Sequence, residues 1–392
     1  MYLSGYDKGL AMAFYLKFSV STFLLIFTAA CFLIGGSFLW YPLIFLGIIG
    51  TIGDWVLPGH TSTKTPKHPE RVNVFLYATL PLVWLCIYVL IVRIDMQSGS
   101  FLQGLITSLS LLPTTDIGQD DTSNLIGGFL SLGLMTATTA TNVAHELCHR
   151  TWHKGSQWTS LGLLAFTCDT SFAIEHVYGH HRNVATFADP ASARRGENAW
   201  SFVIRSTIGS IKGAYSFEKM RLEKRNIPFL SLQNRLFHGY AMCAAYALTM
   251  ALIFQSWQGL IFYAVLALNG KLYLELINYI EHYGLVRIPG TPVLPKHSWN
   301  SNHAASTFIL YNLTRHSHHH AKGHLAFWKL NAKTKAPMLP YGYLTMMIIA
   351  TVPPLFKRIM TPKLREWDEN FADSAERDHA KKYGYDKLAL SA

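Results

Sequence analysis

Residues 239–282 read GYAMCAAYALTMALIFQSWQGLIFYAVLALNGKLYLELINYIEH, and this stretch decides the fold. Two mostly apolar runs, roughly 239–256 and 258–280, are joined by the short turn Ser256-Trp257-Gln258-Gly259. A helix crosses the hydrocarbon core of a bilayer when about 20 mostly apolar residues follow one another. The stretch therefore predicts two membrane-spanning helices, and the second places Glu281 and His282 directly at the membrane boundary.

The composition of the whole chain agrees with a membrane protein. Half of the 392 residues (50%) are hydrophobic and only 15% are charged, whereas soluble domains carry about a quarter charged residues. The net charge of +11 could suggest nucleic acid, but the basic residues flank the apolar runs. Orientation in a membrane explains that placement better, so we expect the lipid bilayer as a partner and no nucleic acid.

Four further runs are apolar and long enough to span a bilayer: roughly 18–36, 38–57, 73–92 and 123–144. Two other apolar stretches are not. The stretch 101–113 is too short and is expected to be interfacial or re-entrant, and the prolines of 340–356 favour an interfacial or half-buried helix. We predict an all-α integral membrane protein with six transmembrane helices, forming one domain over residues 1–392.

The distribution of lysine and arginine predicts the orientation. Six spans place both termini, the loop 58–72 and the segments 145–238 and 281–392 on one side, which carries most of the basic residues. The loop 93–122 on the other side has only Arg93 against four aspartates. The basic side is therefore expected to be cytoplasmic. Five cysteines with no C-x-x-C pair predict buried, reduced thiols and exclude a rubredoxin domain within the chain.

Four histidine clusters fall on this predicted cytoplasmic side, and each has spacing that brings imidazoles together. Histidines three or four residues apart project side by side from a helix, and imidazole suits iron, copper, zinc and nickel. Nine imidazoles are too many for one ion but suit two, which predicts an oxygen-activating enzyme. The nine are His145, His149, His176, His180, His181, His282, His316, His319 and His320.

Other interpretations of these residues remain open. The sequence His145-Glu-Leu-Cys-His149 also matches the zinc metalloprotease signature, in which the glutamate is the base. A protease needs only one further ligand, so the seven additional clustered histidines favour the two-metal interpretation. Carboxylates commonly orient ligand histidines, and we assign that role, or less often direct metal binding, to Glu146, Glu175, Asp189 and Glu281.

The remaining histidines are weaker candidates. His318 lies between ligand positions, where helical geometry turns it away, and is expected to be a second-shell or surface residue. Near the clusters but less favoured are His153, His303 and His324. Those expected to be solvated or interfacial are His60, His68, His238, His297 and His379.

The clusters and their surroundings resemble the membrane-bound alkane 1-monooxygenase family and the related xylene monooxygenase hydroxylase subunits. The resemblance covers about residues 50 to 370. It rests on residues 142–150 (NVAHELCHR), 175–191, 278–285 (NYIEHYGL), 299–302 (WNSN), 313–321 (LTRHSHHHA) and 336–343 (APMLPYGY). The histidine clusters alone also allow a fatty-acid desaturase, whereas NYIEHYGL and RHSHHH favour the alkane hydroxylases.

The resemblance implies six spanning helices and a cytoplasmic di-iron site whose ligands are the nine clustered histidines. It also implies a bacterial inner-membrane location, dioxygen as co-substrate, and insertion of one oxygen atom into an inert C–H bond. Terminal hydroxylation of medium- or long-chain n-alkanes is the favoured reaction. Two features of this chain differ from the usual pattern of the alkane hydroxylases. The alkane enzymes usually have aspartate where this chain has His318, and segments 201–212 and 285–287 are equally typical of xylene-type enzymes.

Alternatives and partners complete the hypothesis. Benzylic methyl hydroxylation, fatty-acyl desaturation or decarboxylation, and a non-catalytic metal-binding membrane protein remain open. Trp55 is expected either to line a substrate tunnel or to anchor its helix at the interface. Electrons would come from a rubredoxin or ferredoxin-type donor with an NAD(P)H reductase. The electron donor could dock on a group of basic residues, although the preference for positive charge on the cytoplasmic side explains these residues equally well. They are Arg194, Arg195, Lys219, Arg221, Lys224, Arg225, Lys329, Lys333 and Lys335.

Overall fold

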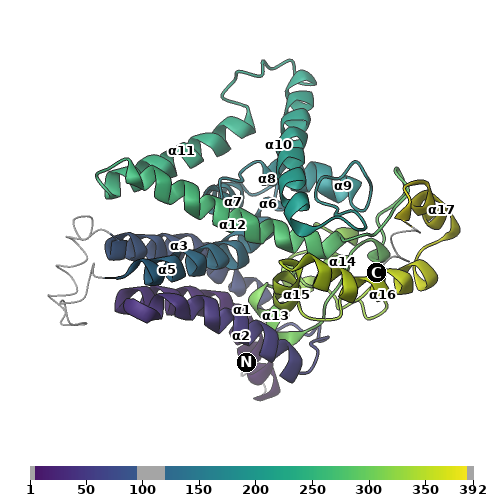
Figure 1. Cartoon of the computed structure of the whole chain (residues 1–392), viewed down its shortest axis with the longest axis horizontal. Helices are drawn as coiled ribbons and strands as arrows, with labels where there is room; N and C mark the ends of the chain where they lie inside the picture. Colours follow the sequence, from purple (N-terminus) through teal and green to yellow (C-terminus); the bar gives the residue numbers. More distant parts are fainter. Residues whose placement is uncertain (1–4, 95–119, 386–392) are drawn as a thin grey trace.

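The computed structural model describes residues 5–94 and 120–385 (Figure 1), so the predicted interfacial stretch 101–113 lies outside the described residues. Within these ranges the secondary structure is helical, apart from one isolated bridge between Asn300 and Met338. The first helices are α1 (Gly5–Ile34), η1 (Gly36–Trp40), α2 (Tyr41–Val56), η2 (Pro69–Val72), α3 (Asn73–Ile94), α5 (Thr122–Met135), η5 (Thr136–Thr141), α6 (Asn142–Cys148) and α7 (Lys154–Ala165).

The rest of the described chain continues with shorter helices around two long ones. These are α8 (Phe172–Glu175), η6 (His176–His180), α9 (His181–Asn183), α10 (Ala199–Glu223), α11 (Arg235–Ile253), α12 (Gln258–His282), η7 (Pro295–His297), α13 (Ala304–Ile309), α14 (His316–Ala321), η8 (Phe327–Lys329), α15 (Tyr343–Ala350), α16 (Pro353–Asn370) and α17 (Ser374–Lys382). The prediction of an all-α protein is confirmed for these residues.

Five helical stretches are long and apolar enough to cross a membrane: Lys8–Ile34, Gly36–Val56, Pro69–Ile94, Arg235–Ile253 and Gln258–His282. They overlap five of the six predicted spans, and the chain is a multi-pass membrane protein. The sixth predicted span, 123–144, is helical as α5, η5 and the start of α6. It is not among the five, and it remains a prediction.

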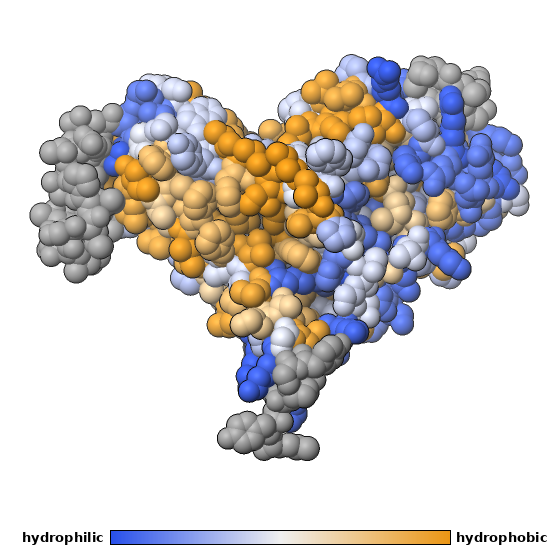
Figure 2. All heavy atoms as spheres, turned by 90° about the horizontal axis from the view of Figure 1, so that it is seen from below, coloured by the Kyte–Doolittle hydropathy of each residue, from blue (hydrophilic) through white to orange (hydrophobic). Residues whose placement is uncertain are grey.

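The long helices form a bundle whose outer surface is apolar. In Figure 1, α1, α2, α3 and α5 lie side by side, α12 packs against α5, and α11 packs against α12. Large apolar side chains such as Phe23, Ile48 and Leu268 are exposed on this bundle. Figure 2 shows the apolar surface over the bundle, while hydrophilic side chains gather at the end where α16 and α17 lie. Apolar side chains facing outwards over long helices are expected where the surrounding solvent is lipid.

A buried carboxylate joins the membrane bundle to the histidine-bearing C-terminal segment. Asp54, near the end of α2, is 5% exposed. It accepts a hydrogen bond of 2.8 Å from the backbone N–H of Ser306 and a second one from the Ser306 hydroxyl. These contacts satisfy a free N–H in the first turn of α13. Gly342 approaches the same carboxylate so closely that a Cβ there would overlap it. The end of α2 therefore positions α13, six residues before the last histidine cluster.

Two predictions about the chain are refined. The predicted half-buried helix at 340–356 forms as α15, which ends at Ala350 before the two prolines that open α16. Four of the five cysteines are buried and all are free, but Cys168 is exposed. The prediction of a buried thiol is wrong at this position, because Cys168 lies in the turn after α7 with a backbone φ of 51°.

Candidate metal centre

The first histidine cluster is carried by α6. His145 and His149 are four residues apart, so they project side by side from this helix, with ring centroids 5.2 Å apart. The Nε2 atoms of both rings are buried and have no hydrogen-bond partner. The π-helical segment η5 leads directly into α6, and π turns commonly occur at functional sites. The cluster thus presents two unpartnered nitrogen atoms in the protein interior.

The histidines of the second cluster, His176, His180 and His181, do not all face the same way. Residues 176–180 form the π-helical turn η6, which is wider than an α-helical turn. As a result, Nε2 of His176 lies 3.1 Å from Nε2 of His181, five residues later. His180 turns elsewhere, and its Nε2 lies 3.2 Å from Nε2 of His320. The predicted four-residue spacing therefore does not gather all three imidazoles into one set.

All nine predicted histidines come together in two groups, each with its ligand atoms within 4.8 Å of one another. Neither group, within the described part of the chain, contains a carboxylate or a cysteine. The last cluster contributes to both groups: His319 belongs to the five-histidine group, and His316 and His320 belong to the four-histidine group. The five-histidine group comprises His145, His149, His176, His181 and His319, and the four-histidine group comprises His180, His282, His316 and His320.

The distances within each group fit nitrogen ligands around a common point. Nε2 of His316 lies 3.1 Å from that of His282 and 2.9 Å from that of His320. Two nitrogens bound at a right angle to one metal, each about 2.1 Å from it, are separated by about 3 Å. A neutral imidazole has a single N–H, so hydrogen bonding cannot satisfy a chain of close Nε2 pairs. The residues present therefore fit a di-metal site built from nitrogen donors.

Burial keeps these imidazoles in the form that binds metals. It lowers the pKa of His149 to about 4, with a smaller contribution from His180. Burial, followed by the neighbouring histidines, also holds the pKa of His176, His319 and His320 well below the usual value. A neutral imidazole has a free lone pair, whereas an imidazolium ion has none. At neutral pH these four imidazoles are therefore uncharged nitrogen donors.

Two predicted carboxylates lie beside the outer nitrogens of the four-histidine group. Oδ2 of Asp189 is 2.9 Å from Nδ1 of His180. Burial alone would raise the pKa of Asp189, but His180 and Ser192 lower it overall, so the carboxylate stays ionised. Oε1 of Glu281 lies 3.4 Å from Nδ1 of His316. Asp189 is therefore within hydrogen-bond distance of its ring, whereas Glu281 Oε1 and His316 Nδ1 are close but have no hydrogen-bond partner within the described residues. That these carboxylates orient the rings and leave Nε2 free as the ligand remains a prediction.

The other predicted supporting residues have different surroundings. The carboxylate of Glu146 pairs with Arg150 at 2.9 Å. Glu175 is 3% exposed and packs against the backbone of Gly179 and Gly213; burial and nearby carboxylates raise its pKa well above the usual value. His318 belongs to neither group, and its Nδ1 accepts a 2.8 Å hydrogen bond from the backbone N–H of Asn331. An orienting role for these three residues remains a prediction.

A small, largely apolar cavity of about 20 Å³ touches both histidine groups. Its lining includes His145 and His176 from the first group and His316 from the second. Glu281 is the only carboxyl group among the lining residues, which also include Ala137, Thr141, Asn142, Phe172, Leu274, Ile277, Asn278 and Leu313. The sequence analysis chose only the histidines and Glu281 as site residues, although Asn142, Asn278 and Leu313 belong to the quoted motifs. The remaining lining residues carried no signal, because the cavity forms only when η5, α12 and the last cluster pack together.

Several predicted residues lie away from this cavity or have different roles. Trp55 is 86% exposed at the end of α2, which favours the interfacial anchor over the tunnel wall. His297 was expected to be solvated or interfacial, but it is 1% exposed and lies 2.8 Å from Glu376. Arg195 was assigned to the basic docking surface, yet it is 4% exposed and makes two hydrogen bonds to Asp368. Both predictions are wrong, because residues far along the chain cover these side chains.

Sequence comparison places this arrangement in a known class. A family model described as fatty acid desaturase matches residues 123–350, which include every one of the nine clustered histidines. The chain therefore belongs to the fatty acid desaturase family. Its two buried histidine groups are consistent with the di-metal site typical of that family.

Several individual proteins are similar to this chain in sequence. The chain is 36% identical over 258 residues to alkane 1-monooxygenase 2 of Alcanivorax borkumensis, covering 64% of this chain and 67% of that protein. It is 39% identical over 243 residues to alkane 1-monooxygenase of Acinetobacter baylyi, covering 60% and 59%. It is 32% identical over 255 residues to the xylene/toluene monooxygenase hydroxylase component XylM of Pseudomonas putida, covering 65% and 68%. The matched region thus covers between 59% and 68% of the length of these three relatives.

Proposed function

We propose that the protein is a di-iron, dioxygen-dependent membrane hydroxylase that inserts one oxygen atom into an inert C–H bond of a membrane-soluble hydrocarbon. The favoured reaction is terminal hydroxylation of medium- or long-chain n-alkanes. The observation that carries the proposal is the apolar cavity beside both histidine groups. The relatives named alkane 1-monooxygenase support the choice of substrate.

The five-histidine and four-histidine groups would each hold one iron ion. When bound, the two ions supply dioxygen activation, which amino-acid side chains cannot perform alone. Neutral Nε2 atoms provide the ligands, and Asp189 holds the His180 ring through its Nδ1. Buried imidazoles arranged before a metal binds reduce the reorganisation that binding requires. The protein thus determines where each ion lies and which sides remain accessible.

At about 20 Å³ the cavity has room for little more than one methyl group, so its lining would hold and protect only the reacting end of the substrate. Leu274, Ile277 and Leu313 provide apolar contact for a hydrocarbon chain and exclude water from the reacting carbon. Glu281 is one of the lining residues, and its Oε1 lies beside His316, where it can hold or transfer a proton. The hydrocarbon itself has no group that can form a hydrogen bond, so its position would depend on shape alone.

Electron supply and location follow the same proposal. We infer a bacterial inner-membrane location with the metal centre and both termini in the cytoplasm. A rubredoxin or ferredoxin-type carrier, reduced by an NAD(P)H-dependent reductase, would dock on this side. Of the predicted basic residues, Arg194, Lys219, Lys224, Arg225, Lys329 and Lys335 are exposed in the structure. The positive charge of these exposed residues could attract an acidic electron carrier.

The test is product analysis in cells that express the chain with a broad set of rubredoxin or ferredoxin reductases. Octane, hexadecane and xylene are supplied together. A His316→Ala strain serves as the inactive control, and a His318→Ala strain as the control with a replaced histidine outside both groups. Primary alkanols that are absent only from His316→Ala cells would support the proposal, and their length would define the substrate range.

Other products would change the proposed function. Benzylic alcohol alone would place the enzyme beside its xylene/toluene relative. If iron-loaded protein formed neither product, hydrocarbon hydroxylation would be abandoned. Desaturated or shortened fatty acyl chains in those cells would then identify a desaturase or decarboxylase, in line with the family description.

A further inference from the structure

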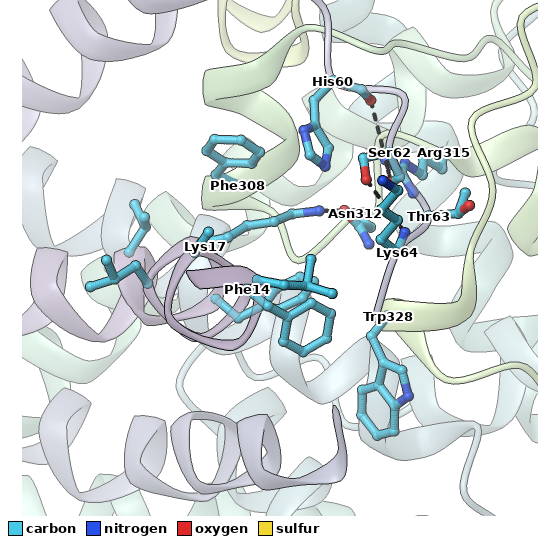
Figure 3. Close-up of a pocket in the computed structure, with 15 residues that line it drawn as sticks. Phe14, Lys17, His60, Ser62, Thr63, Lys64, Phe308, Asn312, Arg315 and Trp328 are labelled. Atoms are coloured by element: carbon cyan, nitrogen blue, oxygen red, sulfur yellow. Dashed lines mark hydrogen bonds between the residues drawn. The ribbon is translucent and has the colours of Figure 1, made fainter. Parts of the chain in front are cut away.

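A second cavity, of about 430 Å³, lies apart from the histidine groups. It is formed by α1, the segment 60–64, α13 and the residues that precede α14 (Figure 3). None of the nine clustered histidines lines it. The lining residues on which the argument depends are Ala13, Phe14, Leu16, Lys17, Lys64 and Arg315. The cavity is therefore a separate site that the proposed reaction does not use.

One end of this cavity is strongly basic. Figure 3 shows Lys17 reaching from α1 towards Asn312, with Lys64 and Arg315 grouped beside it. Nζ of Lys17 donates a 2.6 Å hydrogen bond to Oδ1 of Asn312. Arg315 is 1% exposed and donates only to the backbone carbonyls of Leu330, His60 and Ser62. Its Nε has no hydrogen-bond partner.

No aspartate or glutamate is among the lining residues. The hydrogen bonds and ion pairs of Lys17 and Arg315 within the described residues also include no carboxylate. Burying a cation is costly unless an anion compensates it. A half-buried lysine beside a buried arginine, with no acidic partner for either in the described part of the chain, therefore indicates an anionic ligand.

The other end of the cavity is apolar and opens towards the lipid-facing side of a membrane helix. Phe14 is buried, while Leu16 is 62% exposed on the same wall. Met12, one turn away, is 64% exposed. These residues belong to Lys8–Ile34, one of the five helices long and apolar enough to cross a membrane. A ligand entering here would come from the bilayer, with its apolar part beside α1 and its charged part beside Lys17.

We propose that this cavity is a binding site for one anionic phospholipid, whose phosphate is held by Lys17 and Arg315 and one of whose acyl chains lies along α1. Phosphate oxygens accept charge-assisted hydrogen bonds from lysine and arginine, and basic pockets between membrane helices suit anionic headgroups. Because Arg315 directly precedes His316, the bound phosphate would also fix the turn that leads into the last histidine cluster.

The experiment uses the purified full chain in a neutral detergent, after delipidation. Phosphatidylglycerol is titrated against the wild type, Lys17→Gln and Ala13→Trp. The second variant keeps the charge but fills the apolar end at an exposed position. Lys8→Gln is the matched control, because Lys8 is an exposed lysine of the same helix outside the cavity. Binding is measured by native mass spectrometry, and thermal stability by intrinsic fluorescence.

We expect one phosphatidylglycerol per chain and a raised unfolding temperature for the wild type and Lys8→Gln. Lys17→Gln and Ala13→Trp should each weaken binding at least tenfold. Binding by both variants at wild-type affinity would overturn the proposal, and so would equal binding of phosphatidylcholine, whose headgroup has no net charge. Equal stabilisation by inorganic phosphate or by oleate would overturn the assignment to a phospholipid, since either would show that headgroup or chain alone suffices.

Discussion

The carboxylate of Asp189 lies 2.9 Å from Nδ1 of His180, on the opposite side of the ring from the Nε2 atom that approaches His320. We expect this contact to fix both the tautomer and the orientation of the imidazole. Asp189 itself is 1% exposed and accepts a 2.6 Å hydrogen bond from Ser192. The histidine is therefore held by a carboxylate that is itself fixed in place.

Replacing this carboxylate with an amide tests its orienting role. We expect Asp189→Asn to lower the affinity of the four-histidine group for iron by about 10- to 100-fold. The amide has one acceptor oxygen, which cannot serve both His180 and the Ala191 N–H, and it is uncharged. The measurement is iron per chain after dialysis against a graded chelator. Asp378→Asn is the control, since the Asp378 side chain is 69% exposed. Unchanged iron retention in Asp189→Asn would remove the orienting role.

The division of the nine histidines into two groups predicts selective loss of one ion. His149→Ala should empty the five-histidine group, and His282→Ala the four-histidine group, because each change removes one Nε2 from a set that converges on one point. Iron content should fall from about two to about one per chain in either variant. His318→Ala should keep both ions. Mössbauer spectra of iron-57-loaded protein should show different remaining sites in the two variants, and identical spectra would contradict the grouping.

The small cavity predicts that added volume affects turnover rather than metal binding. Ala137 is 1% exposed and lines the cavity of about 20 Å³. We expect Ala137→Val to lower turnover of the hydrocarbon substrate about tenfold or more, because one or two added methyl groups change pocket binding by about 1–3 kcal/mol. Iron content should stay at the wild-type value. Ala244→Val, at an exposed position of α11, is the control. Unchanged turnover in Ala137→Val would show that this cavity does not hold the substrate.

An ion cluster between α10 and α11 predicts a pH dependence of stability. Burial alone would raise the pKa of Glu218, but hydrogen bonds from Arg221 and Arg235 lower it from 4.5 to about 2. The folded pKa is below the unfolded one, so the stabilisation is complete above pH 4.5 and is lost as pH falls towards 2.

We expect Glu218→Gln to lower the free energy of unfolding at pH 7 by about 2 kcal/mol, or the unfolding midpoint by about 4 °C. The difference from the wild type should be constant between pH 7 and 5 and smaller at pH 3.5. Glu223→Gln, with a side chain 62% exposed, should behave like the wild type. Thermal scans in detergent at the three pH values provide the comparison. A difference that grows on acidification would contradict the sign.

The sequence was sufficient for features that depend on local periodicity. Apolar length predicted five of the observed long helices, and four-residue spacing predicted that His145 and His149 lie side by side. The same spacing holds for His316 and His320, whose Nε2 atoms are 2.9 Å apart. In each case one helix fixes the geometry, so neighbouring residues contain the necessary information.

Features that depend on packing between distant segments could not be predicted. The π-helical turn η6 brings together His176 and His181, although nothing in the local composition signals a wider turn. Asp54 contacts Ser306 across 252 positions, and His297 is covered by Glu376. Assigning a histidine to one group or the other required the whole fold, because the last cluster supplies both groups.

That sharing has a consequence for biosynthesis. During translation the first two clusters emerge long before His316, His319 and His320, the last of the nine along the chain. Since each group takes histidines from this final cluster, neither group can be complete while the ribosome is still making the segment before it. Both groups are therefore completed by the same late docking event, and a chain that stalls before residue 316 would lack both rather than one.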